Sequence, residues 1–192
     1  MMPLPEEFFN RDAKLVGKEI LGKLLVRRLG NAKLVGKIVE TEAYYGAKDP
    51  ASRARKSKNL DKWWRAAKPS TVFVYMVHGN WLLNIVTSKV NNEPSGILIR
   101  ALEPLKGVEV MMKRRRAKEI EGLVSGPGKL TQAFGITSSY TGLSVCKRSS
   151  KLIVTEGLNK NIKILRSYRI GVKEDLPEKL RFYIADNKFV SR

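Results

Sequence analysis

The sequence has little of what metalloenzymes and covalent catalysts commonly use. Its 192 residues include a single cysteine, Cys146, and a single histidine, His78. One cysteine excludes a disulfide framework and a thiolate metal cluster. One histidine argues against a zinc site or a histidine-based catalytic triad. We therefore expect no metal and no cofactor, and any chemistry must use carboxylates, tyrosines, amides and water.

Long apolar runs are also missing. No run approaches the roughly 20 residues that span a bilayer, and the N-terminal "MMPLPEEFFN" has no apolar signal core. We expect a soluble protein of the cytoplasm, nucleoid-associated in a prokaryote, that makes no contact with a membrane. The length suits one domain over residues 1–192.

Acidic residues are scarce beside basic ones. Lysine and arginine number 37 against 18 aspartates and glutamates, for a net charge of +19. Such an excess is typical of proteins that bind a polyanion, above all nucleic acid. A heat-adapted proteome is an alternative source of charge, but adaptation usually raises both signs together. The charge therefore favours a nucleic-acid partner.

The apolar pattern predicts paired strands with helices between them. "KLLVRRL" and "AKLVGKIVETEAYY" form one expected hairpin, joined at Gly30-Asn31, and "TVFVYMVH" and "WLLNIVTS" form another, joined at Gly79-Asn80. "SGILIRALEPL" and three short tail runs, "KLIV", "NIKIL" and "LRFYI", are further strands. Helices are expected in "NRDAKLVGKEILGK", "LDKWWRAAK" and "GVEVMMKRRRAKEI", and after "GPGK". This order favours an α+β fold with a largely antiparallel sheet flanked by helices.

Two carboxylates lie on one expected strand, in "VETEAYYG". Because side chains alternate along a strand, Glu40, Glu42 and Tyr44 share one face. A carboxylate at the mouth of an apolar face is suited to act as a general base if a cation or water supports its ionised form. The alternative is that both glutamates pair with lysines and arginines on the surface, as many exposed ion pairs do.

Two polar residues interrupt apolar strands: Asn84 in "LLNIV" and Arg100 in "ILIRAL". A buried amide or guanidinium without a partner costs several kcal/mol. Asn84 could be a core amide that braces backbone, and Arg100 could form an internal salt bridge with Glu40, Glu42 or Glu103. Alternatively both line a wet pocket, together with an acid and tyrosines, that holds one planar polar ligand beside a water.

The second hairpin carries two further candidates. His78 lies at or beside a tight turn, so we expect it to be exposed, either as an ordinary turn residue or as a wedge inserted into a DNA minor groove. Tyr75, on the incoming strand, either packs in the core or faces the pocket. The basic runs "SRARKSK" and "MKRRRAK" are consistent with phosphate contacts.

Five blocks in order resemble a known family. They are "IVETEAYYG…DPAS", "TVFVYMVHGNWLLNIV", "GILIRALEPL", "SGPGKLTQAFGI" and "LRFYIADNKFVS". Together they are similar to the alkyladenine (3-methyladenine) DNA glycosylase family of the human-enzyme type. The resemblance implies a single α+β domain around a curved antiparallel sheet, and a monomer. It also implies base flipping and excision of damaged purines from double-stranded DNA, with no metal and no lyase step.

The same resemblance implies roles for individual residues. Glu42 is similar to the general base that activates water against C1′ of the flipped nucleotide. Tyr44 and Tyr75 resemble the aromatic walls that sandwich the base, and Asn84 the amide that discriminates against the exocyclic amino group of guanine. Arg100 resembles the arginine that helps to hold the water and the nucleotide's phosphate. Glu40 is then left with a structural role.

The chain departs from the family pattern at two positions. Arg53 follows "DPAS", where the family commonly has a pocket histidine, and we expect it either to stack on a neutral base or to turn outward to a phosphate. His78 stands where the family usually has an intercalating tyrosine. We expect its smaller wedge to retain the flipped nucleotide less firmly.

Two alternatives belong to other classes. A non-catalytic RNA- or ribosome-binding module would explain the net charge but not a carboxylate aimed into a pocket. A glycoside hydrolase could use Glu40 and Glu42, since alternate residues of a strand lie about 6.6–7 Å apart, within the range for an inverting pair. Polysaccharide hydrolases, however, have little use for such basicity.

Overall fold

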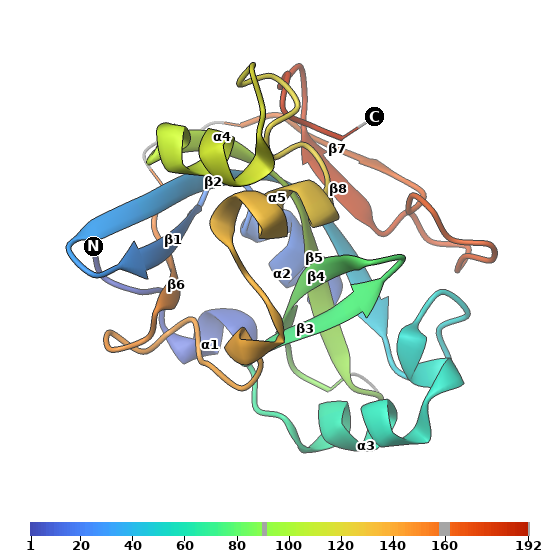
Figure 1. The fold of residues 1–192 in the computed structure, drawn as a ribbon. Coiled ribbons are helices and arrows are strands. Elements are labelled where there is room, and N and C mark those ends of the chain that lie inside the picture. Colours follow the sequence, from blue (N-terminus) through green and yellow to red (C-terminus); the bar gives the residue numbers. More distant parts are fainter. Residues whose placement is uncertain (90–91, 158–161, 192) are drawn as a thin grey trace.

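The computed structural model describes residues 1–89, 92–157 and 162–191 (Figure 1). Within them eight strands form one antiparallel sheet in the order β3-β4-β5-β2-β1-β6, with β8 beside β2 and β7 beside β8. The strands are β1 (Leu24–Leu29), β2 (Ala32–Tyr45), β3 (Val72–Val77), β4 (Asn80–Val86), β5 (Ser95–Lys106), β6 (Leu152–Thr155), β7 (Ile164–Ser167) and β8 (Arg181–Ile184). The helices are α1 (Glu6–Phe9), α2 (Ala13–Glu19), α3 (Lys58–Ala66), α4 (Val108–Arg115) and α5 (Pro127–Phe134), with short 3₁₀ turns η1 (Arg53–Lys56) and η2 (Ser138–Tyr140).

The longest strand, β2, is the spine of the sheet. β5 pairs along one edge of it, while β1 and then β8 pair along the other, β8 meeting β2 at Glu40 to Glu42. The pairing of β2 with β5 shifts register on both sides of Glu40. Such bulges bend a strand and increase its twist, and the sheet curls into a half-barrel. The expected single α+β domain with a curved antiparallel sheet is therefore confirmed.

The core lies between the sheet and the helices that cover it. Strand residues such as Ile38, Ile97 and Leu102 are fully buried, and so is Phe134 of α5. α2 begins at the cap residue Asp12, whose side chain accepts the backbone N–H of Lys14. Burial of these apolar faces, at about 25 cal/mol per Å², stabilises the half-barrel on which the site is built.

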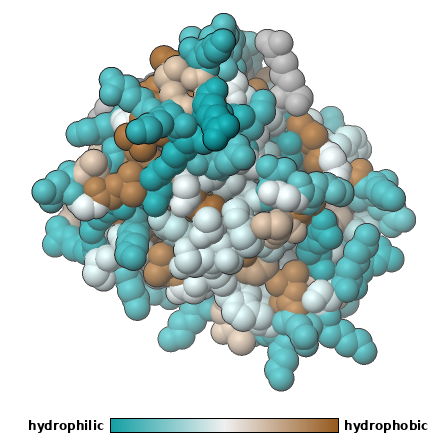
Figure 2. Space-filling model, in the orientation of Figure 1, coloured by the Kyte–Doolittle hydropathy of each residue, from teal (hydrophilic) through white to brown (hydrophobic). Residues whose placement is uncertain are grey.

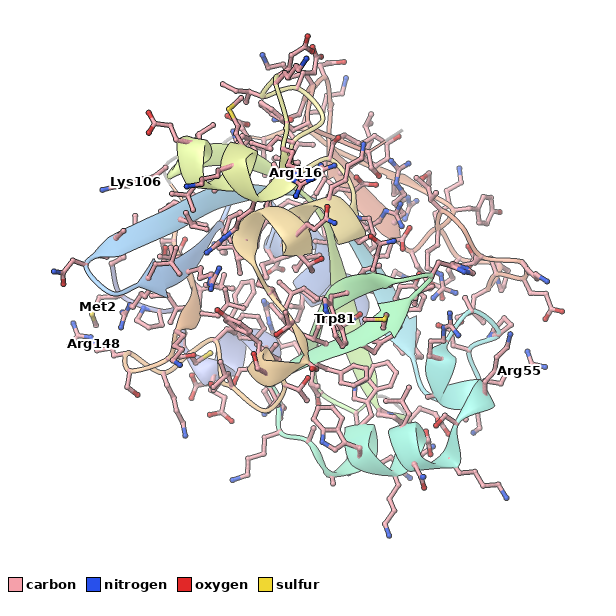
Figure 3. The ribbon with its side chains drawn as sticks, in the orientation of Figure 1. Met2, Arg55, Trp81, Lys106, Arg116 and Arg148 are labelled. Carbon is pink, nitrogen blue, oxygen red and sulfur yellow. The ribbon has the colours of Figure 1, made fainter. Side chains whose placement is uncertain are left out.

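The β3–β4 hairpin is confirmed, with its turn one residue earlier than expected. His78 and Gly79 are the two turn residues and both have positive φ, +46° and +76°. Two positive φ values are typical of the tight turn that matches strand twist. α5 holds the hairpin close to its turn, because Thr131 Oγ1 donates to the carbonyl of Trp81 at 2.7 Å, and Figure 3 shows Trp81 on this hairpin beside α5.

Some element boundaries differ from the expected ones. α4 ends at Arg115, well before Ile120, because Arg116 adopts a left-handed conformation that caps the helix. The segment after "DPAS", expected as a loop, contains η1, which Ser52 caps. The expected tail strand "NIKIL" begins at Asn161, outside the described residues, and β7 begins at Ile164. Among the described residues, no helix is long and apolar enough to cross a membrane.

Candidate active site

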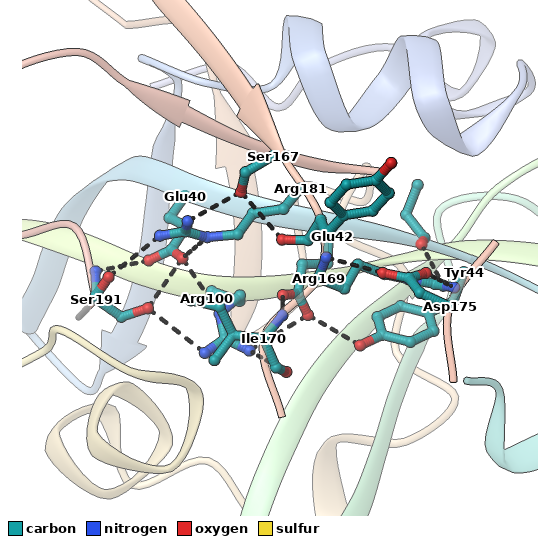
Figure 4. Close-up of polar contacts among 12 residues, drawn as sticks. Glu40, Glu42, Tyr44, Arg100, Ser167, Arg169, Ile170, Asp175, Arg181 and Ser191 are labelled. Atoms are coloured by element: carbon teal, nitrogen blue, oxygen red, sulfur yellow. Dashed lines mark hydrogen bonds and ion pairs between the residues drawn. The ribbon is translucent and has the colours of Figure 1, made fainter. Parts of the chain in front are cut away.

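The carboxylate of Glu42 is the centre of the candidate site (Figure 4). Its side chain has no exposed surface. Oε2 accepts hydrogen bonds from the Tyr44 hydroxyl at 2.9 Å and from Arg100 Nη1 at 3.2 Å, and Oε1 accepts the backbone N–H of Ile170 at 2.7 Å. The alternative that Glu42 pairs with cations on the surface is therefore wrong.

Burial controls the charge of this group. It raises the pKa of Glu42, because the ionised form loses its hydration. The nearby Arg100 guanidinium, the Ile170 N–H and the Tyr44 hydroxyl lower the same pKa, but by less than burial and the Glu40 charge together raise it. Burial and the Glu42 charge in turn raise the pKa of Tyr44 well above its usual value, so this hydroxyl stays protonated and donates. Glu42 is thus a carboxylate whose affinity for a proton is increased, as a general base requires.

Glu40, two residues earlier, is equally buried but surrounded by donors. Arg181 Nε lies 2.6 Å from Oε1, and Ser191 contributes its N–H at 2.7 Å to Oε2 and its hydroxyl at 2.9 Å to Oε1. Arg100 Nε adds a fourth contact, to Oε1 at 3.2 Å. These four donors tie Glu40 to Arg100 of β5, Arg181 of β8 and Ser191 of the C-terminal segment, which fits a structural role.

Arg100 bridges the two carboxylates. Its side chain donates to Glu40 through Nε and to Glu42 through Nη1, both at 3.2 Å. The expected internal salt bridge is confirmed with these two partners, while Glu103 instead pairs with Lys37 at 2.6 Å. Because Glu40 orients the guanidinium, its Nη1 meets Glu42 in a defined geometry.

An aromatic hollow opens beside Tyr44, whose hydroxyl donates to Glu42, while Glu42 and Arg100 are not among the residues that line it. The lining residues come from β2, η1, α3, β3 and β4: Tyr44, Ser52, Arg53, Ala54, Leu60, Trp64, Phe73, Tyr75 and Asn84. The free volume is about 20 Å³, room for about one water molecule. Burial raises the pKa of Tyr75 to about 12. The structure thus brings the two expected tyrosines and the expected amide to one hollow.

Aromatic stacking and one amide build the β3–β4 side of this hollow. The rings of Phe73 and Tyr75 stack with centroids 5.2 Å apart, and Trp63 of α3 packs on Phe73 at 4.8 Å. Asn84 is 8% exposed, and its Nδ2 donates to the carbonyls of Phe73 and Leu82 at 3.4 and 3.3 Å. Asn84 therefore braces the backbone, as one expectation has it, and also borders the hollow, while its contact with a ligand stays a prediction.

A second hollow, here called the basic hollow, adjoins the first, and four of its five charged lining residues are lysine or arginine. It has a volume of about 630 Å³ and shares Ser52 and Arg53 with the aromatic hollow. Its lining residues are Pro50, Ala51, Ser52, Arg53, Arg55, Lys56, His78, Gly171, Val172, Lys173 and Glu174. His78 is exposed, as expected from the turn, and Arg53 is exposed at the boundary between the two hollows. The Arg53 charge lowers the pKa of Tyr75 against the effect of burial.

Comparison with known proteins agrees with this arrangement. A family model described as methylpurine-DNA glycosylase matches residues 7–188. The chain belongs to the methylpurine-DNA glycosylase family. Similar proteins named "Putative 3-methyladenine DNA glycosylase" occur in Clostridium botulinum strain Loch Maree, 40% identical over 204 residues with 99% of each chain covered, and in Clostridium perfringens strain 13, 40% identical with 100% covered.

Membership in the methylpurine-DNA glycosylase family carries the coarse function. The chain is a DNA glycosylase, a hydrolase of DNA repair whose substrate is DNA with alkylated bases such as 3-methyladenine. The fold and the basic surface agree with such a substrate. Figure 2 shows hydrophilic side chains gathered over the upper part and the rim of the visible face.

Two arginines of one basic run also brace the fold of the glycosylase. In "MKRRRAK", Arg114 donates to the carbonyl of Ala133, and Arg115 to the carbonyls of Gly122 and Leu123. Burial lowers the pKa of both guanidinium groups. The other run, "SRARKSK", does border the basic hollow, and Figure 3 shows Arg55 on the outer side of η1.

Several site residues of the glycosylase were missed from the sequence. Arg169, Asp49 and Asp175 form a buried ion cluster behind Tyr44, and Ile170 supplies an N–H to Glu42. Nothing in "SYRIGVKED" sets its arginine apart from the other 36 basic residues. Only the contacts across the fold identify them. Among the described residues, no three of the histidine, cysteine, aspartate and glutamate side chains form a group that could hold a metal ion.

Proposed function

We propose that this protein flips damaged purine nucleotides out of duplex DNA into the aromatic hollow and hydrolyses their N-glycosidic bond. The observation that carries the proposal is the buried Glu42 carboxylate with raised proton affinity beside a hollow lined by Tyr44 and Tyr75. A pure binding module has no need to bury a charge in this way, because burial costs free energy. The finer likeness to the human-enzyme type belongs to the same proposal.

Glu42 is the general base in this proposal. It takes a proton from water while the water oxygen forms a bond to C1′ and the bond from C1′ to the purine nitrogen breaks. The electron pair of that bond leaves with the base. Arg100 holds Glu42 and, with its remaining donor capacity, the water or the nucleotide's phosphate. An alkylated purine is already cationic, so it leaves as a neutral base with little acid assistance.

Base recognition uses the rings and the amide of the hollow. Tyr44 and Tyr75 are the proposed walls, and stacking of a base on aromatic rings is worth roughly 1–3 kcal/mol. Asn84 presents its amide to the edge of the base, where it discriminates against the exocyclic amino group of guanine. A hollow of about 20 Å³ does not accommodate a purine. Base entry therefore requires the side chains at its mouth to move.

Arg53 is the side chain best placed to move, because it is exposed and lies between the two hollows. If its guanidinium stays near the base, it repels a cationic lesion and favours neutral ones such as hypoxanthine or ethenoadenine. If it turns into the basic hollow, it contacts a phosphate. Excision of these neutral lesions is part of the proposal for this chain.

His78 is the proposed wedge. It lies at the tip of a hairpin that α5 holds close to the turn, and it borders the basic hollow through which the DNA strand would pass. Insertion at a base step compensates for the unstacking that flipping requires, a few kcal/mol. Independence from metals, absence of a lyase step, a monomeric state and a place in the cytoplasm stay predictions from the sequence, as does the extent of the domain over residues 1–192.

The test uses duplex oligonucleotides with one lesion each: hypoxanthine, ethenoadenine or 7-methylguanine. They are incubated with the protein in EDTA and split into two samples, of which one is heated in alkali to cleave abasic sites. We expect strand breaks only after alkali, since a monofunctional glycosylase leaves the sugar–phosphate intact. Glu42→Gln is the matched control, and we expect it to bind DNA but to give no breaks. Breaks from Glu42→Gln at the wild-type rate would refute the role of Glu42.

A further inference from the structure

Arg169 is the centre of a buried ion cluster behind the candidate site. Its side chain is fully buried. Nη1 and Nη2 lie 2.7 and 2.8 Å from the two carboxylate oxygens of Asp49, while Nε and Nη2 lie 2.8 and 2.6 Å from Oδ1 of Asp175. Nη1 also donates to the carbonyl of Ala43 at 3.0 Å. One guanidinium thus joins the end of β2, the loop before η1 and the segment that follows β7.

The same guanidinium stacks on a wall of the aromatic hollow. Its central carbon lies 4.5 Å from the ring centroid of Tyr44. Arg169 is not one of the residues that line the hollow, whereas Tyr44 is. Arg169 therefore acts on a bound base only through Tyr44, whose ring it holds from behind by a cation–π contact.

The backbone extends this influence to the carboxylate. The N–H of Arg169 donates to Asp175 Oδ2 at 3.0 Å, and the next residue, Ile170, donates its N–H to Glu42 Oε1 at 2.7 Å. Besides Arg100, two donors reach Glu42, and Arg169 is connected to each of them. The Tyr44 hydroxyl belongs to the ring on which Arg169 stacks, and the Ile170 N–H belongs to the residue that follows Arg169.

We propose that Arg169 is a positioning residue for the excision reaction: it holds Tyr44 and the Ile170 peptide so that both donate to Glu42. The inference rests on the proposed function and deepens it. An arginine is required because its planar fork binds two carboxylates and stacks on a ring at the same time, which the single ammonium of a lysine does not reproduce. Holding the ring in place before the base arrives also reduces the ordering cost of binding.

A consequence for protonation follows. The charged and titratable groups that face Glu42 are Arg100 from β5, Glu40 and Tyr44 from β2, and Tyr75 from β3, and the remaining neighbour is the Ile170 N–H. Loss of the Tyr44 and Ile170 donors removes two contributions that lower the Glu42 pKa, while burial continues to raise it. Displacing Arg169 should therefore increase the proton affinity of Glu42.

The experiment compares three variants with the wild type. Arg169→Lys keeps the positive charge but loses the planar guanidinium that binds both carboxylates. Asp175→Asn keeps the guanidinium and weakens only its contacts with one carboxylate. It is included in case Arg169→Lys fails to fold. Arg65→Lys is the matched control, because Arg65 also joins two carboxylates and a carbonyl, those of Asp61, Glu93 and Asn92, and touches neither Tyr44 nor Glu42. Two quantities are measured: the Glu42 titration by ¹³C NMR of the free protein, and single-turnover excision at saturating enzyme.

We expect Arg169→Lys, and more weakly Asp175→Asn, to shift the Glu42 titration to higher pH. Excision by Arg169→Lys at neutral pH should fall by about tenfold to a hundredfold, whereas Arg65→Lys should change it by no more than about twofold. An unchanged Glu42 titration in both Arg169→Lys and Asp175→Asn would overturn the inference, whether or not the wild type excises bases. If the titration shifts while the wild type excises no lesion, the positioning of Glu42 stands and the proposed function fails.

Discussion

Glu40 and Glu42 lie two residues apart on one strand and are both fully buried, yet their contacts predict opposite effects of the same substitution. Glu40→Gln places an amide among four donors: two from Ser191 and one each from Arg100 and Arg181. Glu42→Gln removes the proposed base but leaves Glu40 to hold Arg100. We expect the first change to reduce stability and the second to abolish excision.

The magnitudes follow from burial. Removing one partner of a buried ion cluster costs about 3–5 kcal/mol, because the remaining charges lose their compensation. In a domain of this size each kcal/mol lowers Tm by about 2–4 °C, so Glu40→Gln should lower Tm by about 6–20 °C. Glu42→Gln should change Tm less, because burial already disfavours the charged carboxylate and the amide removes that cost. Its excision rate should fall by about 10²–10⁴, the usual contribution of a general base.

The assays are thermal unfolding followed by circular dichroism and single-turnover excision well below the Tm of either variant. Measured together, they separate folding from chemistry within one pair of isosteric changes. A Tm loss of Glu42→Gln that equals or exceeds that of Glu40→Gln would refute the division of roles. So would a Glu40→Gln protein with wild-type Tm.

Three further results are expected. The excision rate should decrease as pH falls through the raised pKa of Glu42, since the ionised form is the base. Because the folded protein binds this proton more tightly than the unfolded chain, the contribution of Glu42 to stability increases as pH falls and is lost as pH rises through that pKa. Arg53→His should raise the rate for 7-methylguanine relative to hypoxanthine, and an unchanged ratio would remove Arg53 from the pocket. His78→Ala should weaken lesion-DNA affinity and excision, and unaltered values in gel-shift and single-turnover assays would exclude the wedge.

The hairpins and most helices could be predicted because their signals are local. Gly30-Asn31 and the glycine after His78 mark turns that only a few residue types adopt without strain, and the alternation in β2 places Glu40 and Glu42 on one face. The end of α4 could not be predicted, since Arg116 adopts a left-handed conformation that its residue type does not favour.

The candidate site divides in the same way. Glu42, Tyr44, Tyr75, Asn84 and Arg100 were recognisable because each is a polar or aromatic residue in an otherwise apolar strand, or lies in a block that resembles a family. Phe73 and Trp64 also line the hollow, but the sequence does not identify them as lining residues, since the same apolar side chains are expected in an ordinary core.

Sequence alone therefore determined the elements, the excess of positive charge and the residues able to do chemistry without a metal, because these depend on neighbours within a few positions. The fold decided which of two identical carboxylates is bound by Arg181 and Ser191 and which accepts the hydroxyl of Tyr44, a wall of the aromatic hollow. It also brought Arg169 to Asp49, 120 positions away in the chain. Such contacts depend on how β2 bends and where the C-terminal segment returns, and long-range packing of this kind leaves no periodic pattern to read.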